Sequence, residues 1–453
     1  MRKEKAVSQY DRMMTTPVWK LVVELGLPTT VSMLVSNIYN VADTYFVGQV
    51  GTSASGAIGV VFALMAIIQA IGFMLGHGAG SHIARQLGAK KVEEASTYAS
   101  TSFFLALSLG SLITIIGLCN LDRLCLLLGS TGTILPYARV YATYVLCAAP
   151  AMTVSCVTNN ILRYEGRALF AMIGLTLGGL LNIFGDWLLM GTHFRMGVAG
   201  AGLATLLSQY ISAIVLTGMF LRGKTQSKLS VRLFARKWHV VADIVAVGSP
   251  SLARQGLNSI STMILNICAG SWGDAAVAAM AIVGKITNFL FCVAVGIGQG
   301  FQPVSAYNYG AKNYKRVRDA FRFAVAFSTV LLSVIGIFGF SFASSLVRWM
   351  RDDDLVVAIG TFALRACCVS LPFLAVSIVG NMLFQSIGKA GQALFLASLR
   401  SGLCFIPVLL ILTKAMGLRG VEISQPLSNL LSFCITIPCV VHFFHTLPKQ
   451  TSV

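Results

Sequence analysis

The sequence predicts an all-α integral membrane protein with twelve transmembrane helices in two six-helix lobes, related by pseudo-twofold symmetry along the membrane normal. Three observations predict this fold class. Apolar stretches recur from end to end, the first half of the chain is repeated in the second, and basic residues gather in alternate loops. The composition agrees, because 56% of the residues are hydrophobic and only 11% are charged, whereas a soluble domain carries about 25% charged residues.

Each apolar stretch is long enough to cross a hydrocarbon core about 30 Å thick, which takes about 20 residues of helix. The sequence lacks the short alternating strands of an outer-membrane barrel, so that class is excluded. We expect spans at 17–48, 53–84, 95–119, 134–161, 168–191, 197–221, 240–270, 276–306, 317–346, 355–386, 392–414 and 420–446. Because each half contains an even number of spans, both halves enter the membrane in the same orientation.

Residues of the first half recur in the second half at one constant offset of 222. The pairs include Pro28 with Pro250, Gly76 with Gly298, Gly78 with Gly300, Asn159 with Asn381 and Gly166 with Gly388. Many secondary transporters use such duplicated bundles to build a central site that opens to alternate sides. We therefore expect an N-terminal lobe over 1–221, a basic cytoplasmic linker over 222–239 and a C-terminal lobe over 240–453.

The net charge of +18 is distributed unevenly. Basic residues precede the first span, join spans two and three, fill the linker and follow span eight, which places them on one side of a twelve-span chain. This is the positive-inside bias, so we expect both termini in the cytoplasm and no nucleic-acid partner. The eleven cysteines form no C-x-x-C pair and are typical of small packing residues.

The run GMFLRGKT, from Gly218 to Thr225, formally matches a phosphate-binding loop. It lies at the end of a membrane span instead of between a buried strand and a helix, so we expect no nucleotide there. The spans show no nucleophile–base pair and no metal triad, which argues against an intramembrane enzyme. We expect no cofactor, and the energy for transport then comes from an ion gradient or from downhill flux.

Few acids lie inside the predicted spans, where ionisable groups are costly and mark function, and we single out two of them. Asp43 ends a polar stripe along the first span that also contains Asn40, while Asp186 lies four residues after Asn182 on one helix face of the fifth span. Interhelical hydrogen bonding explains the amides well and the carboxylates poorly. Two carboxylates, an amide and a hydroxyl would suit Na⁺, and the same acids with raised pKa values would suit H⁺.

The two halves differ in their buried charge. Asp43 corresponds to Leu265 in the repeat, so the carboxylate cluster exists only in the first half. The second half instead carries four cations well inside its spans, of which we expect three to face a cavity: Arg254, Lys285 and Arg365, with Arg400 able to reach the interface along its apolar stem. Pro28 and Pro250 lie within the first span of each half, and we expect these kinks to serve gating.

At these residues the chain resembles the multidrug and toxic compound extrusion (MATE) family. The matching segments are VADTYFVGQVG in the first span, ILRYEGRALFAM after the fourth, NIFGDWLLM and MGVAGAGLATLLSQ across spans five and six, and GQGFQPVSAYNYGAKNYKRV after the eighth. Its general layout resembles the MepA-like bacterial branch of that family. The resemblance implies two six-helix lobes around a central cleft and cation-driven export of organic compounds.

The resemblance also implies further site residues. Asp43, Asn182 and Asp186 match the cation site of the family, and Thr205 matches its hydroxyl on the sixth span. Tyr39 and Asn159 match polar groups that support that site. Some relatives use acids on spans seven and ten, where this chain has Arg254 and Arg365 instead, so a second cation site is not expected here.

We therefore expect a monomeric, ion-coupled antiporter in the cytoplasmic (inner) membrane of a bacterium. It would export organic compounds, cationic or amphipathic, in exchange for H⁺ or Na⁺, and its partners would be these small molecules and the lipid bilayer. The alternative is a flippase for a lipid-linked oligosaccharide or another anionic amphiphile. The basic residues of the second half favour this alternative, whereas the carboxylates of the first half disfavour it.

Overall fold

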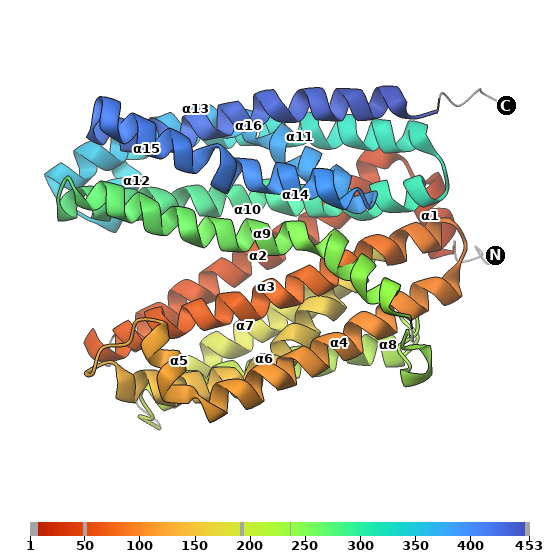
Figure 1. The fold of residues 1–453 in the computed structure, drawn as a ribbon, viewed down its shortest axis with the longest axis horizontal. Coiled ribbons are helices and arrows are strands. Elements are labelled where there is room, and N and C mark those ends of the chain that lie inside the picture. The colour runs from red at the N-terminus through yellow and green to blue at the C-terminus, as the bar shows by residue number, and fades with distance from the viewer. Residues whose placement is uncertain (1–7, 49–51, 191–193, 236, 449–453) are drawn as a thin grey trace, which may run out of the picture. The chain divides into compact units, whose positions relative to one another are not determined.

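The computed structural model describes residues 8–48, 52–190, 194–235 and 237–448, without the side chains of residues 40–45, 47, 48, 52 and 55. In the described part every element of regular secondary structure is a helix (Figure 1). The elements are α1 (Gln9–Thr15), α2 (Val18–Gly48), α3 (Thr52–Gly88), α4 (Val92–Cys119), α5 (Leu121–Leu127), α6 (Leu135–Tyr164), α7 (Ala168–Met190), α8 (Val198–Leu221), η1 (Val231–Leu233), α9 (Trp238–Gly270), α10 (Asp274–Gly310), α11 (Tyr314–Ser341), α12 (Ala343–Met350), α13 (Asp354–Ser386), α14 (Ala390–Ser398), η2 (Leu399–Leu403), α15 (Phe405–Met416) and α16 (Leu418–Thr446).

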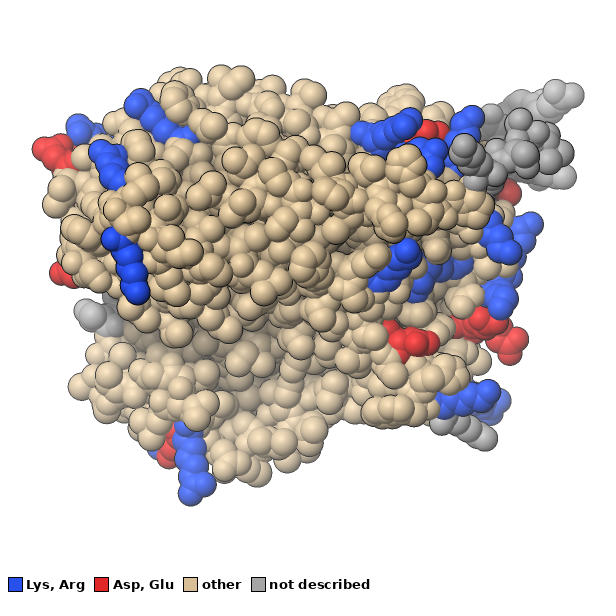
Figure 2. Space-filling view, turned by 45° about the horizontal axis from the view of Figure 1, so that its top comes forward, with Lys and Arg blue, Asp and Glu red and all other residues tan. Residues whose placement is uncertain are grey.

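The predicted class, an all-α integral membrane protein of twelve spans, is confirmed. Eleven spans in the described residues are long and apolar enough to cross a membrane, and one of them is α14, η2 and α15 taken together. The twelfth is α9, which at 33 residues is long enough but carries many polar side chains. On the face shown in Figure 2, charged side chains gather near the helix ends and an uncharged surface covers the middles.

The sequence analysis did not predict the short helices α1, α5 and α12. Helices of seven or eight residues show too little apolar periodicity to be recognised. The predicted span 317–346 also runs too far, since α11 ends at Ser341 and α12 begins at Ala343. The predicted span 392–414 is interrupted by η2, a turn of π-helix.

The repeat seen in the sequence is also a repeat of backbone geometry. Lys90 and Lys312 both have positive φ, 63° and 59°, and so do Gly166 and Gly388, at 79° and 83°. The short helices α5 and α12 begin 222 residues apart, at Leu121 and Ala343. The two halves are therefore built from one six-helix unit with the same connecting turns.

The described residues form two compact units. One unit is Val31–Gly248, and the other combines Met1–Thr30 with Ser249–Val453. They differ from the predicted lobes at the starts of α2 and α9 and in the linker. The first part of α2 packs in the unit formed by the second half of the sequence, and the first part of α9 packs in the unit formed by the first half. The unit boundaries fall two residues from Pro28 and next to Pro250.

Equivalent glycines allow these exchanged helix segments to pack closely. A Cβ on Gly78 of α3 would lie 1.9 Å from the carbonyl oxygen of Ile244 on α9. A Cβ on Gly300 of α10 would lie 2.3 Å from the backbone nitrogen of Gly26 on α2. Because both obstacles are backbone atoms, no side chain can be added at either position without separating the helices.

The linker is anchored by hydrogen bonds to buried or half-buried side chains of the unit Val31–Gly248. The carboxylate of Glu165, which has no exposed surface, accepts bonds from the backbone N–H of Gln226 at 2.7 Å, the N–H of Ser227 at 3.0 Å and the hydroxyl of Ser227. The N–H of Lys228 donates to the hydroxyl of Ser96, and the N–H of Ala235 to that of Thr101, each at 3.0 Å. The predicted linker is therefore a docked strap that contains η1.

Candidate functional site

One face of α7 is buried, and it carries the predicted carboxylate and amide of the fifth span. The buried residues of this helix recur at helical spacing: Ala168, Ala171, Gly174, Gly178, Gly179, Asn182 and Asp186. Asp186 has no exposed surface, and Asn182 is 4% exposed. An acid on a buried face of otherwise small residues has lost its contact with bulk water, so its charge depends on the groups that surround it.

The hydroxyl of Thr205 on α8 lies beside the amide of Asn182. The amide nitrogen of Asn182 donates to the Thr205 hydroxyl over 3.2 Å, and Thr205 is 4% exposed. The helices approach closely here, since a Cβ on Gly185 would lie 2.8 Å from the Cβ of Ala204. The structure thus brings together Asn182 and Thr205, 23 residues apart, one turn of α7 from Asp186.

Tyr39 on α2 packs against the same face of α7. A Cβ on Gly179 would lie 3.3 Å from the ring of Tyr39 and 3.3 Å from Val35, so the absence of a side chain at Gly179 admits the tyrosine. Gly179 precedes Asn182 by three residues, which places Tyr39 within one helical turn of the amide. Asn40 and Asp43 follow in the same helix, but their side chains lie outside the described residues.

Asn159 lies away from this group. Its amide donates to the carbonyl of Ala171 in the first turn of α7, at 2.9 Å. Ala171 precedes Asn182 by eleven residues, or about 16 Å along the helix at 1.5 Å per residue. In the second half Asn381 donates to the carbonyl of Ala393 at 2.6 Å, with the same offset of 222. The hydrogen bond of Asn159 therefore connects two helices, and the equivalent bond is present in the second half of the repeat.

The four cations within the spans of the second half, three of which are predicted to face a cavity, separate into two groups. Arg254 lines a pocket, and Arg400 lines the same pocket. Arg365 is exposed and donates to the carbonyl of Phe340 at 3.4 Å, with its guanidinium 5.3 Å from the Phe340 ring. Lys285 is also exposed and is not among the residues that line this pocket.

Sequence reasoning ranked Arg400 below the other three cations because its stem could reach the interface. The structure places it instead in a π-turn, between α14 and α15. Nothing in local sequence pattern specifies a π-turn, so only the tertiary structure could reveal this position.

Comparison with known proteins agrees with the repeat. A family model described as MatE matches residues 28–188 and again residues 250–411, one match in each half of the chain. The chain belongs to the MATE family. Within it, the multidrug export protein MepA of Staphylococcus aureus strain MRSA252 is 26% identical over 407 residues, which cover 90% of each chain. The chain is thus a multi-pass membrane transporter and not an enzyme.

Solved MATE structures have the same fold. An outward-facing multidrug resistance MATE family transporter of the MOP superfamily is 28% identical, with a TM-score of 0.92, over 99% of this chain and 100% of that one. A MOP superfamily transporter from Pyrococcus furiosus has the same scores, and its binding pocket is described as having reverse polarity, suggesting a different function. The family fold, with two six-helix lobes, therefore applies to this chain.

Proposed function

We propose that this MATE protein is a secondary antiporter that exports organic compounds across the cytoplasmic membrane in exchange for H⁺ or Na⁺. One observation carries the proposal: the fully buried carboxylate of Asp186 lies one helical turn from the bonded pair Asn182 and Thr205. A carboxylate withdrawn from water inside a membrane is costly unless it binds a proton, a cation or a donor. Binding of a proton or a metal cation neutralises such a carboxylate, and release of that cation restores its negative charge.

In the proposed mechanism Asp43 and Asp186 bind the coupling ion together, with Asn182 and Thr205 as neutral oxygen ligands. The amide nitrogen of Asn182 is engaged by Thr205, so its oxygen is the atom that can face the ion. Asp43 follows Tyr39 by four residues, and the Tyr39 ring already packs on α7 next to this group. The helix spacing is the reason to expect Asp43 beside Asp186.

Ion binding drives export only if the two conformational states bind the ion with different affinity. Neutralising the carboxylates weakens the attraction for a positively charged substrate, so binding of an external ion favours release of the substrate outward. The helices that would bend are α2 and α9, because each passes from one compact unit to the other beside a proline, Pro28 or Pro250. A proline removes one helix hydrogen bond, which lowers the cost of bending there.

The name of its relative, a multidrug export protein, supports organic compounds as substrates. We further propose that these compounds are cationic or amphipathic, and that the protein is a monomer with both termini in the cytoplasm. A second candidate function is a flippase for a lipid-linked oligosaccharide or another anionic amphiphile. Two arginines in one pocket, Arg254 and Arg400, favour it.

The test is substrate efflux in inverted membrane vesicles that contain the protein, with H⁺ and Na⁺ gradients imposed separately and a fluorescent organic cation as the probe. We expect export to follow one of the two gradients and to fall to background in Asp186→Asn. The matched control is Asp122→Asn, which removes an exposed acid that pairs with Arg139 on a neighbouring helix at 2.9 Å. Gradient-driven export at the unmodified rate by inserted Asp186→Asn protein would contradict the proposal.

A further inference from the structure

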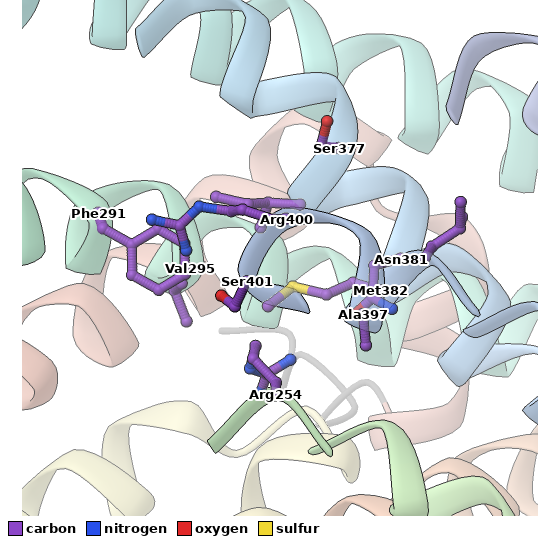
Figure 3. A pocket seen from close by; sticks show the side chains of 11 residues that line it. Arg254, Phe291, Val295, Ser377, Asn381, Met382, Ala397, Arg400 and Ser401 are labelled. Carbon is purple, nitrogen blue, oxygen red and sulfur yellow. The ribbon is translucent and has the colours of Figure 1, made fainter. Parts of the chain in front are cut away.

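The unit that contains Ser249–Val453 has a pocket that is partly open to its surroundings (Figure 3). None of its lining residues is acidic. They come from α9, α10, α13, α14 and η2 and are Arg254, Phe291, Val295, Ser377, Ile378, Asn381, Met382, Leu396, Ala397, Arg400 and Ser401.

Two arginines share this pocket. The guanidinium of Arg400 lies 4.1 Å from the centre of the Phe291 ring, so its flat face is covered while its edge stays available (Figure 3). Its Nε atom is buried and has no hydrogen-bond partner among the described residues. Arg254 reaches the same pocket from α9. Two like charges in one partly dehydrated space repel each other, and an anion between them would reduce that repulsion.

The backbone around Arg400 is built for this position. The π-turn Leu399–Leu403 interrupts the eleventh span, whereas the equivalent helix of the first half, α7, runs without a break. Side chains of neighbouring helices donate hydrogen bonds to carbonyl oxygens of this π-turn. The hydroxyl of Ser428 on α16 donates to the carbonyl of Arg400 at 3.0 Å, and the hydroxyl of Ser261 on α9 donates to the carbonyl of Ser401. π-Turns within helices occur frequently at functional sites.

A third donor and an apolar wall complete the pocket. Ser377 on α13 is 8% exposed, and its hydroxyl has no hydrogen-bond partner among the described residues. The apolar wall combines the Phe291 ring with Met382 and Leu396. In the first half of the repeat, Arg254 corresponds to Ser32, so this concentration of positive charge belongs to the second half alone.

We propose that this pocket binds the anionic end of an amphipathic molecule, a phosphate or a carboxylate, through Arg254, Arg400 and Ser377. The guanidinium fork matches the geometry of both anions, and charge-assisted hydrogen bonds of this kind are the strong ones. The ligand's apolar part would lie along Phe291, Met382 and Leu396. The proposal concerns a site separate from Asp186 and requires no ion gradient, so it stands or fails independently of ion-coupled export.

The experiment measures binding to the purified full-length protein in an uncharged detergent, by calorimetry. Three probes are compared: dodecyl phosphate, inorganic phosphate and dodecyltrimethylammonium. We expect dodecyl phosphate to bind at least about tenfold more tightly than either of the others, because only it offers both the anion and the apolar chain. Binding of inorganic phosphate as tight as that of dodecyl phosphate would overturn the amphipathic part of the proposal, and preference for the ammonium probe would overturn it entirely.

Variants locate the binding. Arg400→Gln and Arg254→Gln should each weaken dodecyl phosphate binding about tenfold or more, and Arg400→Lys should recover only part of the loss, because lysine keeps the charge without the fork. The matched controls Lys285→Gln and Arg365→Gln remove exposed cations of the same half and should bind like the unmodified protein. Unchanged binding by a monodisperse Arg254→Gln/Arg400→Gln double variant would refute the site. If that variant does not fold, the comparison of probes on the unmodified protein still decides.

Discussion

Replacement of Glu165 tests whether a single buried carboxylate holds the linker strap in place. Glu165 follows the last residue of α6, and the strap residues Gln226 and Ser227 donate three hydrogen bonds to it. Ser227 is only 1% exposed, so water cannot readily replace the carboxylate as a partner for its backbone N–H and its hydroxyl. Gln226 is half-buried and can turn its N–H to water once the carboxylate is gone.

The expected cost in Glu165→Ala follows from the two buried donors of Ser227. Each unsatisfied buried donor costs about 1–3 kcal/mol, so the docked strap should lose about 2–5 kcal/mol, allowing for partial relaxation. At about 1.4 kcal/mol per factor of ten, the strap should open between about 30-fold and several thousandfold more often. Glu165→Gln, which keeps one acceptor oxygen, should fall between this variant and the unmodified protein.

The assay is hydrogen exchange of the backbone amides from Gln226 to Ala235, read by mass spectrometry on the purified protein. Lys224→Ala is the control, because this exposed cation lies in the same strap. Exchange should accelerate in Glu165→Ala and remain unchanged in Lys224→Ala. Equal exchange in all three proteins would show that Glu165 does not hold the strap.

The pH dependence of this contact has a definite sign. Burial raises the pKa of the Glu165 carboxyl above its ordinary value of 4.5, although its hydrogen bonds and the nearby Arg167 act in the opposite direction. A group whose pKa is raised on docking favours the docked state at low pH, and that contribution is lost as the pH rises from 4.5 through the docked pKa. Strap opening, corrected for intrinsic exchange rates, should therefore increase with pH in this window and lose that dependence in Glu165→Gln.

Three further predictions follow from particular contacts. Gly78→Ala places a methyl group against a backbone oxygen and should destabilise the protein by about 3 kcal/mol or more in thermal unfolding, whereas Gly218→Ala, with no atom within 4 Å, should be neutral or stabilising by up to about 1 kcal/mol. Thr205→Val removes the acceptor of the Asn182 amide and should weaken ion-driven export in vesicles at least severalfold, while Thr205→Ser restores it. Pro28→Ala restores a helix hydrogen bond and should lower export turnover more than equilibrium binding of the same substrate.

The sequence alone determined the number and approximate limits of the membrane spans. A hydrocarbon core of about 30 Å requires a long stretch of apolar residues in each span, and such stretches are visible in the sequence. It also determined the duplication, because several residue pairs, such as Pro28 and Pro250, share one offset of 222 that can be recognised without a structure. The pairing of Asn182 with Asp186 on one face of α7 followed from helical spacing, which is a local property.

Only the tertiary structure decided which distant residues meet. The exchange of the first parts of α2 and α9 between the compact units depends on backbone contacts at Gly78 and Gly300, and a local pattern does not specify a glycine's partner. The contact of Asn182 with Thr205 was expected from resemblance to a family, and no spacing rule predicts it.

The same limit explains the two features that sequence reasoning missed. The docking of the strap on Glu165 joins residues 61 and 62 positions apart, and the π-turn that carries Arg400 is maintained by hydroxyls of Ser261 and Ser428 on other helices. Hydropathy and periodicity describe how one helix meets an apolar surrounding. They contain no information on which neighbour supplies a donor, so sites assembled between helices become visible only when the chain is folded.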